Sequence, residues 1–163
     1  MLKTLFMAGT RPEAIKLAPV VRRFRACGND RISTVLCSTG QHKEMLAQAF
    51  SDFDVVPDVD LALMQPGQTL AGLSARLFSA LDELFEQHKP DWVVVQGDTT
   101  TVMVASLVAF YRGVKVAHVE AGLRSGDRFH PFPEEVNRRV AGGAADRHFA
   151  PPTGARDNLP RDC

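Results

Sequence analysis

Short apolar runs alternate along this chain with longer segments in which apolar residues recur every three or four positions. The short runs predict buried strands, and the longer period predicts helices with one apolar face. We predict strands over residues Leu2–Ala8, 33–38, 91–98, 114–120 and 147–150. We predict one helix that opens at Pro12, a second over residues 41–50, a third along the leucines from Leu70 to Leu84, and two more over 99–112 and 133–146.

Prolines and glycines refine the helix boundaries. Pro12 and Pro133 are expected at first helical positions, where the missing N–H is not needed. Pro19 removes one backbone hydrogen bond inside the first helix and should bend it. The stretch 51–68 is expected to be irregular.

Strands that alternate with helices over most of the length predict a parallel sheet. The fold class is therefore α/β, with a Rossmann-like parallel sheet and helices on both of its faces, in one domain over residues 1–163. Ligands bind such sheets at the carboxyl ends of the strands. The loops at those ends are polar; the loop residues that carry candidate chemistry are Arg11, Glu13, Lys16, Gln41, His42, Gln96, Asp98, Thr99, His118, Glu120 and Arg124.

Charge and cysteine content limit the partners. Lys+Arg and Asp+Glu both number 19, so the net charge gives no reason to expect nucleic acid or an anionic membrane as a partner. The three cysteines, Cys27, Cys37 and Cys163, lack metal-ligand spacing and fit free thiols in a reducing compartment. No apolar run reaches the length of a membrane span, and we expect a soluble, cytoplasmic protein without a bound metal.

Several candidate residues also have a purely structural explanation. Asp98 precedes a helix and could be its N-cap rather than a catalytic group. Glu134 and Glu135 are each followed four residues later by an arginine, Arg138 or Arg139, as in ordinary exposed ion pairs.

Structural explanations also have to be weighed for two histidines and for Glu120. His42 could be a surface helix residue and His118 a hydrogen-bonded strand residue. Glu120 ends an apolar strand and would be partly buried, so it needs a partner or a raised pKa.

The first loop has no cofactor fingerprint. The segment "GTRPEAIK" lacks the second glycine of a Walker A loop, and no G-x-G-x-x-G follows any strand, so neither NAD nor ATP is implied. A helix N-terminus beside Arg11 and Lys16 suits a phosphorylated ligand, although a solvated helix start explains the same residues. Glu13 falls on the side of Leu17 and Val20 and should face inward or toward the cleft rather than bulk water. It could then organise the loop, for example by bonding backbone N–H groups.

Six ordered motifs carry a specific resemblance: "GTRPEAIKLAPV", "TGQHKEML", "MQPGQ", "QGDTTT", "HVEAGLR" and "PFPEEVNRR". Together they resemble the N-terminal half of the non-hydrolysing bacterial UDP-N-acetylglucosamine 2-epimerases. The resemblance implies one half of a GT-B-like two-domain fold, with the active site between two Rossmann-like domains. It also implies a UDP-sugar substrate, no cofactor, and a homodimer for the full-length form.

The resemblance implies a role for each matching residue. The family interconverts UDP-N-acetylglucosamine and UDP-N-acetylmannosamine by eliminating UDP across C1 and C2 and adding it back. The acid/base residues implied here are Asp98, Glu120 and Glu134, and the substrate-binding residues are Arg11, Lys16 and Arg138. A second, activating UDP-sugar would bind at Gln41, His42 and Gln68.

The family's chains are about twice as long as this one. We therefore expect a truncated N-terminal domain that lacks the C-terminal UDP-binding domain and does not turn over by itself. Three other functions stay open: a hydrolysing relative, an epimerase of a modified UDP-sugar, and a non-catalytic nucleotide-sugar-binding module.

Overall fold

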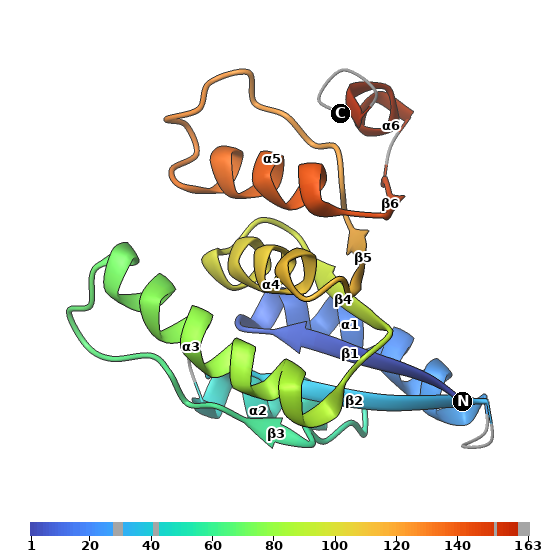
Figure 1. The fold of residues 1–163 in the computed structure, drawn as a ribbon. Helices are drawn as coiled ribbons and strands as arrows, with labels where there is room; N and C mark the ends of the chain where they lie inside the picture. The colour runs from blue at the N-terminus through green and yellow to red at the C-terminus, as the bar shows by residue number, and fades with distance from the viewer. Residues whose placement is uncertain (28–30, 41–42, 152, 160–163) are drawn as a thin grey trace.

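The computed structural model describes residues 1–27, 31–40, 43–151 and 153–159. Strands and helices alternate along the chain (Figure 1). The strands are β1 (Leu2–Ala8), β2 (Ile32–Ser38), β3 (Val59–Asp60), β4 (Trp92–Gln96), β5 (Lys115–Val119) and β6 (Arg147–Phe149). The helices are α1 (Arg11–Ala26), α2 (Lys43–Ser51), α3 (Leu70–His88), α4 (Thr100–Tyr111), α5 (Glu134–Ala144) and α6 (Thr153–Asn158).

The six strands form one parallel sheet in the order β3-β2-β1-β4-β5-β6. β1 lies between β2 and β4, so the chain builds the sheet outward from β1 in both directions. This reversal of strand order opens a crevice at the carboxyl ends of β1 and β4, where ligands bind in sheets of this type. The predicted α/β class and the parallel sheet are confirmed.

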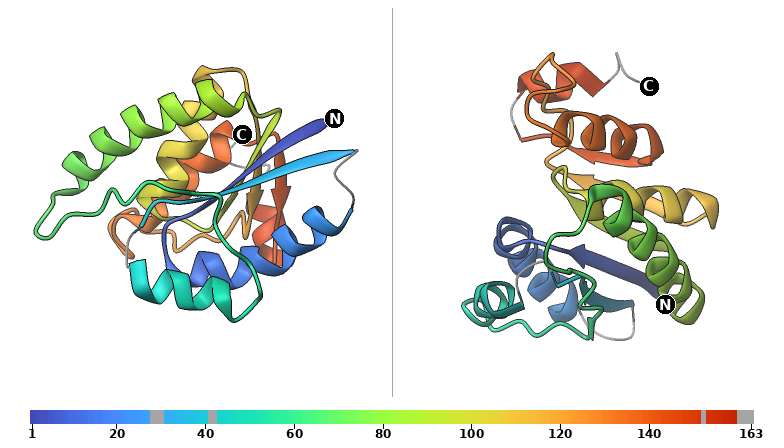
Figure 2. Two further views of the ribbon diagram at one scale, coloured as in Figure 1. Left: turned by 90° about the horizontal axis from the view of Figure 1, so that it is seen from below. Right: turned by 90° about the vertical axis from the view of Figure 1, so that its left-hand side faces the viewer.

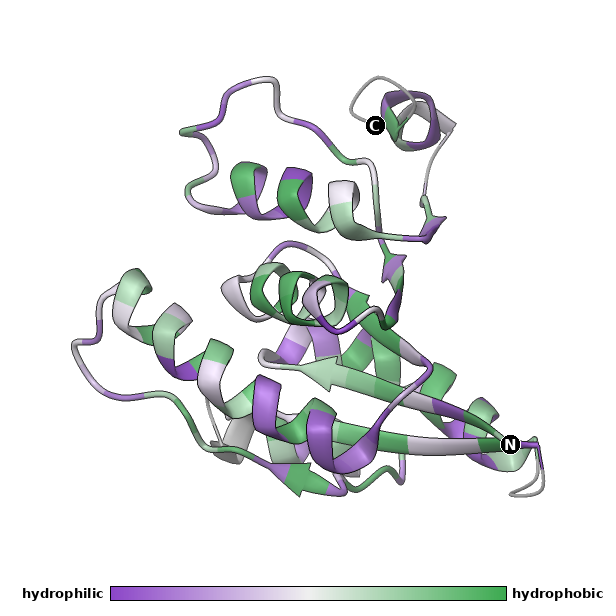
Figure 3. Ribbon diagram, in the orientation of Figure 1, coloured by the Kyte–Doolittle hydropathy of each residue, from purple (hydrophilic) through white to green (hydrophobic). Residues whose placement is uncertain are grey.

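Each face of the sheet has its own core. Leu5 and Met7 of β1 pack on the side of α3, α4 and α5, whereas Phe6 and Ala8 pack on the side of α1 and α2. Figure 2 shows α3 on one side of the strands and α1 and α2 on the other. Both faces are therefore covered, which explains why β4 is apolar along almost its whole length (Figure 3).

The predicted helices form, with small shifts at their ends. α1 begins at Arg11 and continues through Pro19 to Ala26. α3 begins after Thr69, whose hydroxyl accepts a hydrogen bond from the N–H of Gly72 at 3.0 Å. α5 begins at Glu134, so Pro133 is its N-cap rather than its first helical residue as we predicted.

Two short elements were not predicted. β3 contains two residues and lies in the stretch expected to be irregular, and α6 contains six residues. Neither is long enough to show a hydrophobic period. β3 forms because Cys37 and Ser38 of β2 pair with Val59 and Asp60, a contact that no local pattern signals.

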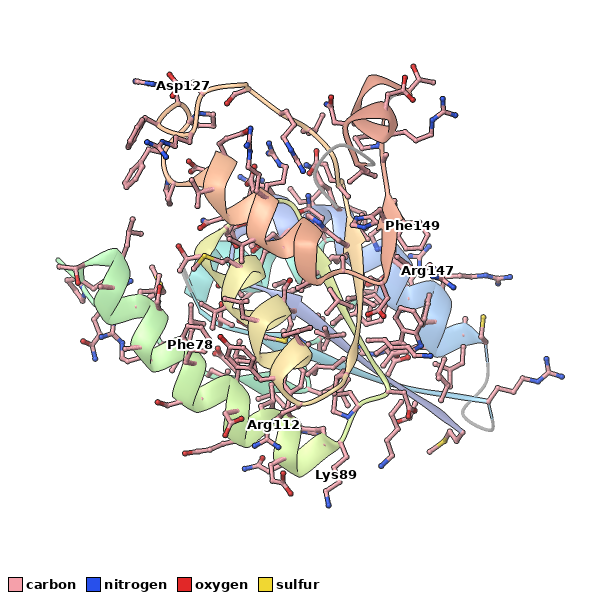
Figure 4. The ribbon with its side chains drawn as sticks, turned by 45° about the horizontal axis from the view of Figure 1, so that its top comes forward. Phe78, Lys89, Arg112, Asp127, Arg147 and Phe149 are labelled. Carbon is pink, nitrogen blue, oxygen red and sulfur yellow. The ribbon has the colours of Figure 1, made fainter. Side chains whose placement is uncertain are left out.

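An ion-pair cluster joins α3 to α4 at the end of the sheet opposite the crevice. Arg112 contacts Asp82 at 2.5 Å and Glu86 at 2.6 Å, and its hydrogen bond lowers the pKa of each carboxyl. Figure 4 shows Arg112 beside the last turns of α3, far from Asp127 on the loop before α5.

Cys27 is exposed and Cys37 is buried, both as free thiols, while Cys163 lies outside the described residues. None of the described helices combines the length and apolarity that crossing a membrane requires.

Candidate active site

The loops after β1 and β2 and the first turn of α4 approach one another closely at Gly9. A Cβ atom on Gly9 would lie 2.7 Å from the hydroxyl oxygens of both Thr39 and Thr101. These two hydroxyls are themselves hydrogen-bonded at 3.1 Å. Glycine is required at this position because any side chain would push apart these three segments, which border the crevice.

Four of the six predicted acid/base and substrate-binding residues line one pocket, which we call pocket A. Pocket A has a volume of about 420 Å³ and includes Arg11, Lys16, Asp98 and Glu120 in its lining. These residues come from the loops and first turns that follow β1, β4 and β5. The topology thus brings together side chains that are more than 100 positions apart, such as Lys16 and Glu120.

Glu120 has a cationic partner. Its Oε2 accepts a hydrogen bond from Lys16 Nζ at 2.6 Å and another from the side-chain amide of Gln96. The backbone of Glu120 has φ +63°, in the left-handed region that non-glycine residues avoid. A strained backbone at a charged residue in a crevice is a feature of functional sites.

Asp98 is not the N-cap of α4. That position is taken by Thr99, whose hydroxyl accepts a hydrogen bond from the N–H of Val102, so the capping explanation for Asp98 is wrong. The Asp98 carboxylate instead pairs with Arg138 of α5, and its main-chain carbonyl accepts a hydrogen bond from the side chain of Asn137 at 3.0 Å. Asn137 was missed by sequence reasoning, because no pattern relates it to a residue 39 positions earlier.

Glu13 faces inward as predicted. Its Oε2 accepts the N–H groups of Gly9 and Thr10, each at 2.6 Å, and its Oε1 accepts the hydroxyl of Thr99 at 2.7 Å. Burial raises the pKa of Glu13, and these hydrogen bonds oppose that shift without cancelling it. Glu13 therefore organises the loops and has little access to a ligand, since it is 2% exposed.

Glu134 lines a second pocket, pocket B, of about 480 Å³. Pocket B adjoins pocket A, because Thr10 and Thr99 line both. Glu134 Oε2 is buried and has no hydrogen-bond partner among the described residues. An unpartnered buried carboxylate oxygen is costly and typical of a site that a ligand completes.

Ion pairs with an arginine four residues later were expected for both Glu134 and Glu135, and only the pair of Glu135 forms. Glu135 pairs with Arg139 at 3.0 Å. Arg138 does not take part in the equivalent pair with Glu134, because it turns to Asp98 and also donates to the carbonyl of Leu123 at 3.1 Å. Burial lowers the pKa of Arg138.

Of the three residues predicted to bind a second UDP-sugar, the structure describes only Gln68. Gln68 lines pocket B, and its side-chain carbonyl accepts a hydrogen bond from Arg76. Gln41 and His42 lie outside the described residues.

His118 is fully buried in β5. Its Nε2 is hydrogen-bonded to the carbonyl of Gly97 at 2.7 Å, as expected for a structural strand histidine, and burial lowers its pKa. Its Nδ1 has no partner among the described residues.

Within the described parts of the chain, no group of three His, Cys, Asp or Glu side chains is placed to hold a metal ion. The crevice instead combines carboxylates, cations and helix N-termini. Such a site can bind a phosphorylated ligand and transfer protons beside it. Fold and site together define a Rossmann-type domain with a candidate acid/base centre at its topological switch point.

Comparison with known proteins identifies the family. Residues 25–162 match the family described as UDP-N-acetylglucosamine 2-epimerase, and the chain belongs to this family. It is 49% identical over 158 residues to the UDP-N-acetylglucosamine 2-epimerase of Bacillus subtilis, covering 97% of this chain and 41% of that protein. It is 48% identical over 162 residues to the enzyme of the same name from Escherichia coli K12, covering 99% of this chain and 42% of that protein.

A solved structure gives the same result. The UDP-GlcNAc 2-epimerase from Neisseria meningitidis, bound to UDP-GlcNAc, matches with a TM-score of 0.94 and 44% identity, covering 99% of this chain and 43% of that chain. The chain thus spans well under half the length of the relatives that it matches.

Proposed function

We propose that this chain supplies part of the active site of a UDP-N-acetylglucosamine 2-epimerase, which interconverts UDP-N-acetylglucosamine and UDP-N-acetylmannosamine. The observation that carries the proposal is the arrangement of two ion pairs across the crevice, Lys16 with Glu120 and Arg138 with Asp98. Each pair places a candidate acid/base carboxylate beside a cation that can bind a diphosphate. Membership of the family supports this substrate.

The chemistry of the reaction explains why the site needs both carboxylates and cations. The C2 proton of the sugar is not beside a carbonyl, so it is removed as UDP departs from C1. The C2–H electron pair then becomes the C1=C2 double bond of a glycal, and the C1–O electron pair leaves with UDP. Re-addition of UDP, with the proton delivered to the opposite face of C2, gives the epimer.

The residues of this chain would divide that work. Asp98, Glu120 and Glu134 would act as the acid/base groups, since they line the two adjoining pockets A and B. Arg11 and Lys16 would stabilise the charge that develops on the departing diphosphate.

Arg138 would hold Asp98 and supply a further contact to the ligand. The orphaned Oε2 of Glu134 supports the assignment of a proton-transfer role to that residue. A second UDP-sugar would bind next to the active site at Gln41, His42 and Gln68, and the complete enzyme would be a homodimer.

We also propose that the complete active site needs residues outside this chain. The Bacillus subtilis relative is covered over only 41% of its length. A single Rossmann-like domain leaves the crevice open on one side, and a second domain would close it. The chain alone would then bind UDP-sugars weakly and produce no epimer.

The test uses a hybrid protein in which residues 1–163 replace the matching part of the Bacillus subtilis relative. The products formed from UDP-N-acetylglucosamine are followed by proton NMR. We expect UDP-N-acetylmannosamine, and a loss of at least about 100-fold in kcat for Asp98→Asn. Asp52→Asn, at an exposed carboxylate just after α2 that lines neither pocket A nor pocket B, is the matched control and should keep full activity.

Other outcomes identify the alternatives. Free N-acetylmannosamine and UDP would indicate a hydrolysing enzyme. Turnover only of an oxidised or further acylated UDP-sugar would indicate a different substrate. Full activity of Asp98→Asn would exclude a catalytic role for Asp98 and favour a non-catalytic binding module.

A further inference from the structure

Two consecutive carbonyl groups in the loop just before α4 are held by buried side chains from two different elements. The carbonyl of Gly97 is hydrogen-bonded to Nε2 of His118 at 2.7 Å. The carbonyl of Asp98 accepts a hydrogen bond from Nδ2 of Asn137 at 3.0 Å. His118 is 0% exposed and Asn137 is 3% exposed. The turn that presents the Asp98 carboxylate is thus fixed from both β5 and α5.

A histidine at position 118 is unusual, because the surrounding core is apolar. Strand alternation puts His118 on the same face of β5 as Val116, within the apolar core between the sheet and α4. Burying an imidazole there costs free energy unless its polar atoms are hydrogen-bonded. Nδ1 has no partner among the described residues, so the contact with Gly97 has to account for the presence of a histidine.

The hydrogen bond also fixes the form of the ring. A carbonyl only accepts, so Nε2 has to carry a proton. Burial lowers the pKa of His118, which favours the neutral ring, in which Nδ1 is the bare nitrogen. Gly97 itself has φ +82°, and its N–H donates to the carbonyl of Val119 at 3.0 Å. Gly97 is therefore held on the β5 side through its N–H and its C=O, and the C=O is the carbonyl of the Gly97–Asp98 peptide.

We propose that His118 is a positioning residue, which orients the Gly97–Asp98 peptide so that the Asp98 carboxylate faces pocket A and Arg138. His118 is fully buried beneath the turn and therefore acts through Asp98. The catalytic part of this inference rests on the proposed function of Asp98, and the structural part does not.

The first experiment uses this chain alone and needs no turnover. Backbone ¹⁵N relaxation gives the order parameter of the Asp98 amide. We expect about 0.85 in the native chain and below about 0.6 in His118→Leu, which removes the hydrogen bond. His118→Gln can still donate an N–H to the Gly97 carbonyl and should restore the native value. If His118→Leu does not fold, His118→Phe takes its place.

Val116→Ala is the matched control, because Val116 is also 0% exposed and lies on the same strand and face. It should loosen the core without affecting the Asp98 amide. An unchanged order parameter in His118→Leu would overturn the proposal, and so would an equal fall in Val116→Ala.

The second experiment measures kcat and KM in the hybrid protein described above. His118→Leu should lower kcat at least tenfold and change KM less than threefold, whereas His118→Gln and Val116→Ala should keep kcat within threefold. Equal losses of kcat in His118→Leu and Val116→Ala would overturn the positioning role. A hybrid with native His118 that shows no turnover would contradict the proposed function, and the order parameters would still decide whether His118 fixes the turn.

Discussion

The hydroxyl of Thr99 donates a hydrogen bond of 2.7 Å to the carboxylate of Glu13, 86 positions earlier in the chain. The other oxygen of Glu13 accepts the N–H groups of Gly9 and Thr10. One buried side chain therefore connects the N-terminus of α1 to that of α4, the two helices that begin on either side of the crevice. This connection sets the spacing between the phosphate-binding candidates on α1 and Asp98 on the loop before α4.

Replacing Glu13 by glutamine should destabilise the chain. A glutamine side chain has one acceptor oxygen, so its NH₂ group has to face either the two backbone N–H donors or the Thr99 hydroxyl. The loss of buried hydrogen bonds predicts a decrease of about 1–3 kcal/mol in the free energy of unfolding, measured by urea denaturation. Glu83→Gln, at an exposed position of α3, should change it by less than about 0.5 kcal/mol. Equal stabilities of the two variants would show that Glu13 does not hold the loops together.

The contribution of His118 to the stability of the chain should fall as the pH is lowered from about 7 to 5. Burial lowers the pKa of His118 in the folded state below its ordinary value of 6.5, so the unfolded chain binds a proton in a range where the folded chain does not. Stability that depends on the neutral ring is present above the unfolded pKa and is lost as the pH falls, by at most about 1.4 kcal/mol per pH unit.

Glu13 has the opposite effect on the pH dependence of the stability. Its folded pKa is raised, so its contribution is largest at low pH and is lost as the pH rises through the folded pKa. Comparison of the native chain with His118→Leu isolates the histidine: the variant should lose less stability between pH 7 and pH 5. A native pH dependence in His118→Leu would contradict the assignment.

The adjacent residues Glu134 and Glu135 should give opposite phenotypes. Glu134 Oε2 lacks a partner among the described residues, so Glu134→Gln should change the free energy of unfolding by less than about 1 kcal/mol. The same substitution should lower kcat of the hybrid protein by about 100-fold or more, because a proton-transfer group is lost.

Glu135 is fully buried and accepts hydrogen bonds from the N–H of Ser125 and from Arg139, each at 3.0 Å. Glu135→Gln should therefore lower the free energy of unfolding by about 1–3 kcal/mol, while the folded fraction keeps most of its kcat. The two variants serve as controls for each other. If both lose activity in proportion to their stability, the catalytic role of Glu134 is wrong.

Lys16 should contribute more to ligand binding than to stability. Its ion pair with Glu120 is partly exposed, with 47% and 27% of the two side chains accessible, and such pairs contribute little to folding. A bound diphosphate would compete with Glu120 for Lys16 and leave the carboxylate free to exchange a proton.

Lys16→Met should therefore weaken the binding of UDP to the hybrid protein by about 10- to 100-fold, measured by calorimetry. Lys3→Met, at the exposed opposite end of the sheet, should have no effect. Unchanged affinity in Lys16→Met would remove Lys16 from the binding site.

The sequence predicts the strands and long helices of this fold better than its short elements. The strands and the long helices carry a clear hydrophobic period, and the inward direction of Glu13 follows from its position relative to Leu17. β3 is too short for such a period and depends on pairing with β2.

The candidate site shows the same limit. The loop positions placed Arg11, Lys16, Asp98 and Glu120 at one end of the sheet, and the structure brings them into pocket A. The partner of each carboxylate could not be predicted, because a local pattern suggested Arg138 for Glu134 and the fold gives it to Asp98. Contacts between residues about 40 positions apart are decided by the packing of α5 against α4, not by helical spacing.

We propose above all that Asp98, Glu120 and Glu134 move the C2 proton of a UDP-sugar, and this proposal can be tested in one experiment. Its most direct test is incubation of the hybrid protein with UDP-N-acetylglucosamine in D₂O, with deuterium at C2 followed by NMR. We predict deuterium at C2 of both epimers with the native residues, and a loss of at least about 100-fold in its rate of incorporation for each of Asp98→Asn, Glu120→Gln and Glu134→Gln. Epimer formation without deuterium at C2, or incorporation at the native rate in all three variants, would contradict the claim.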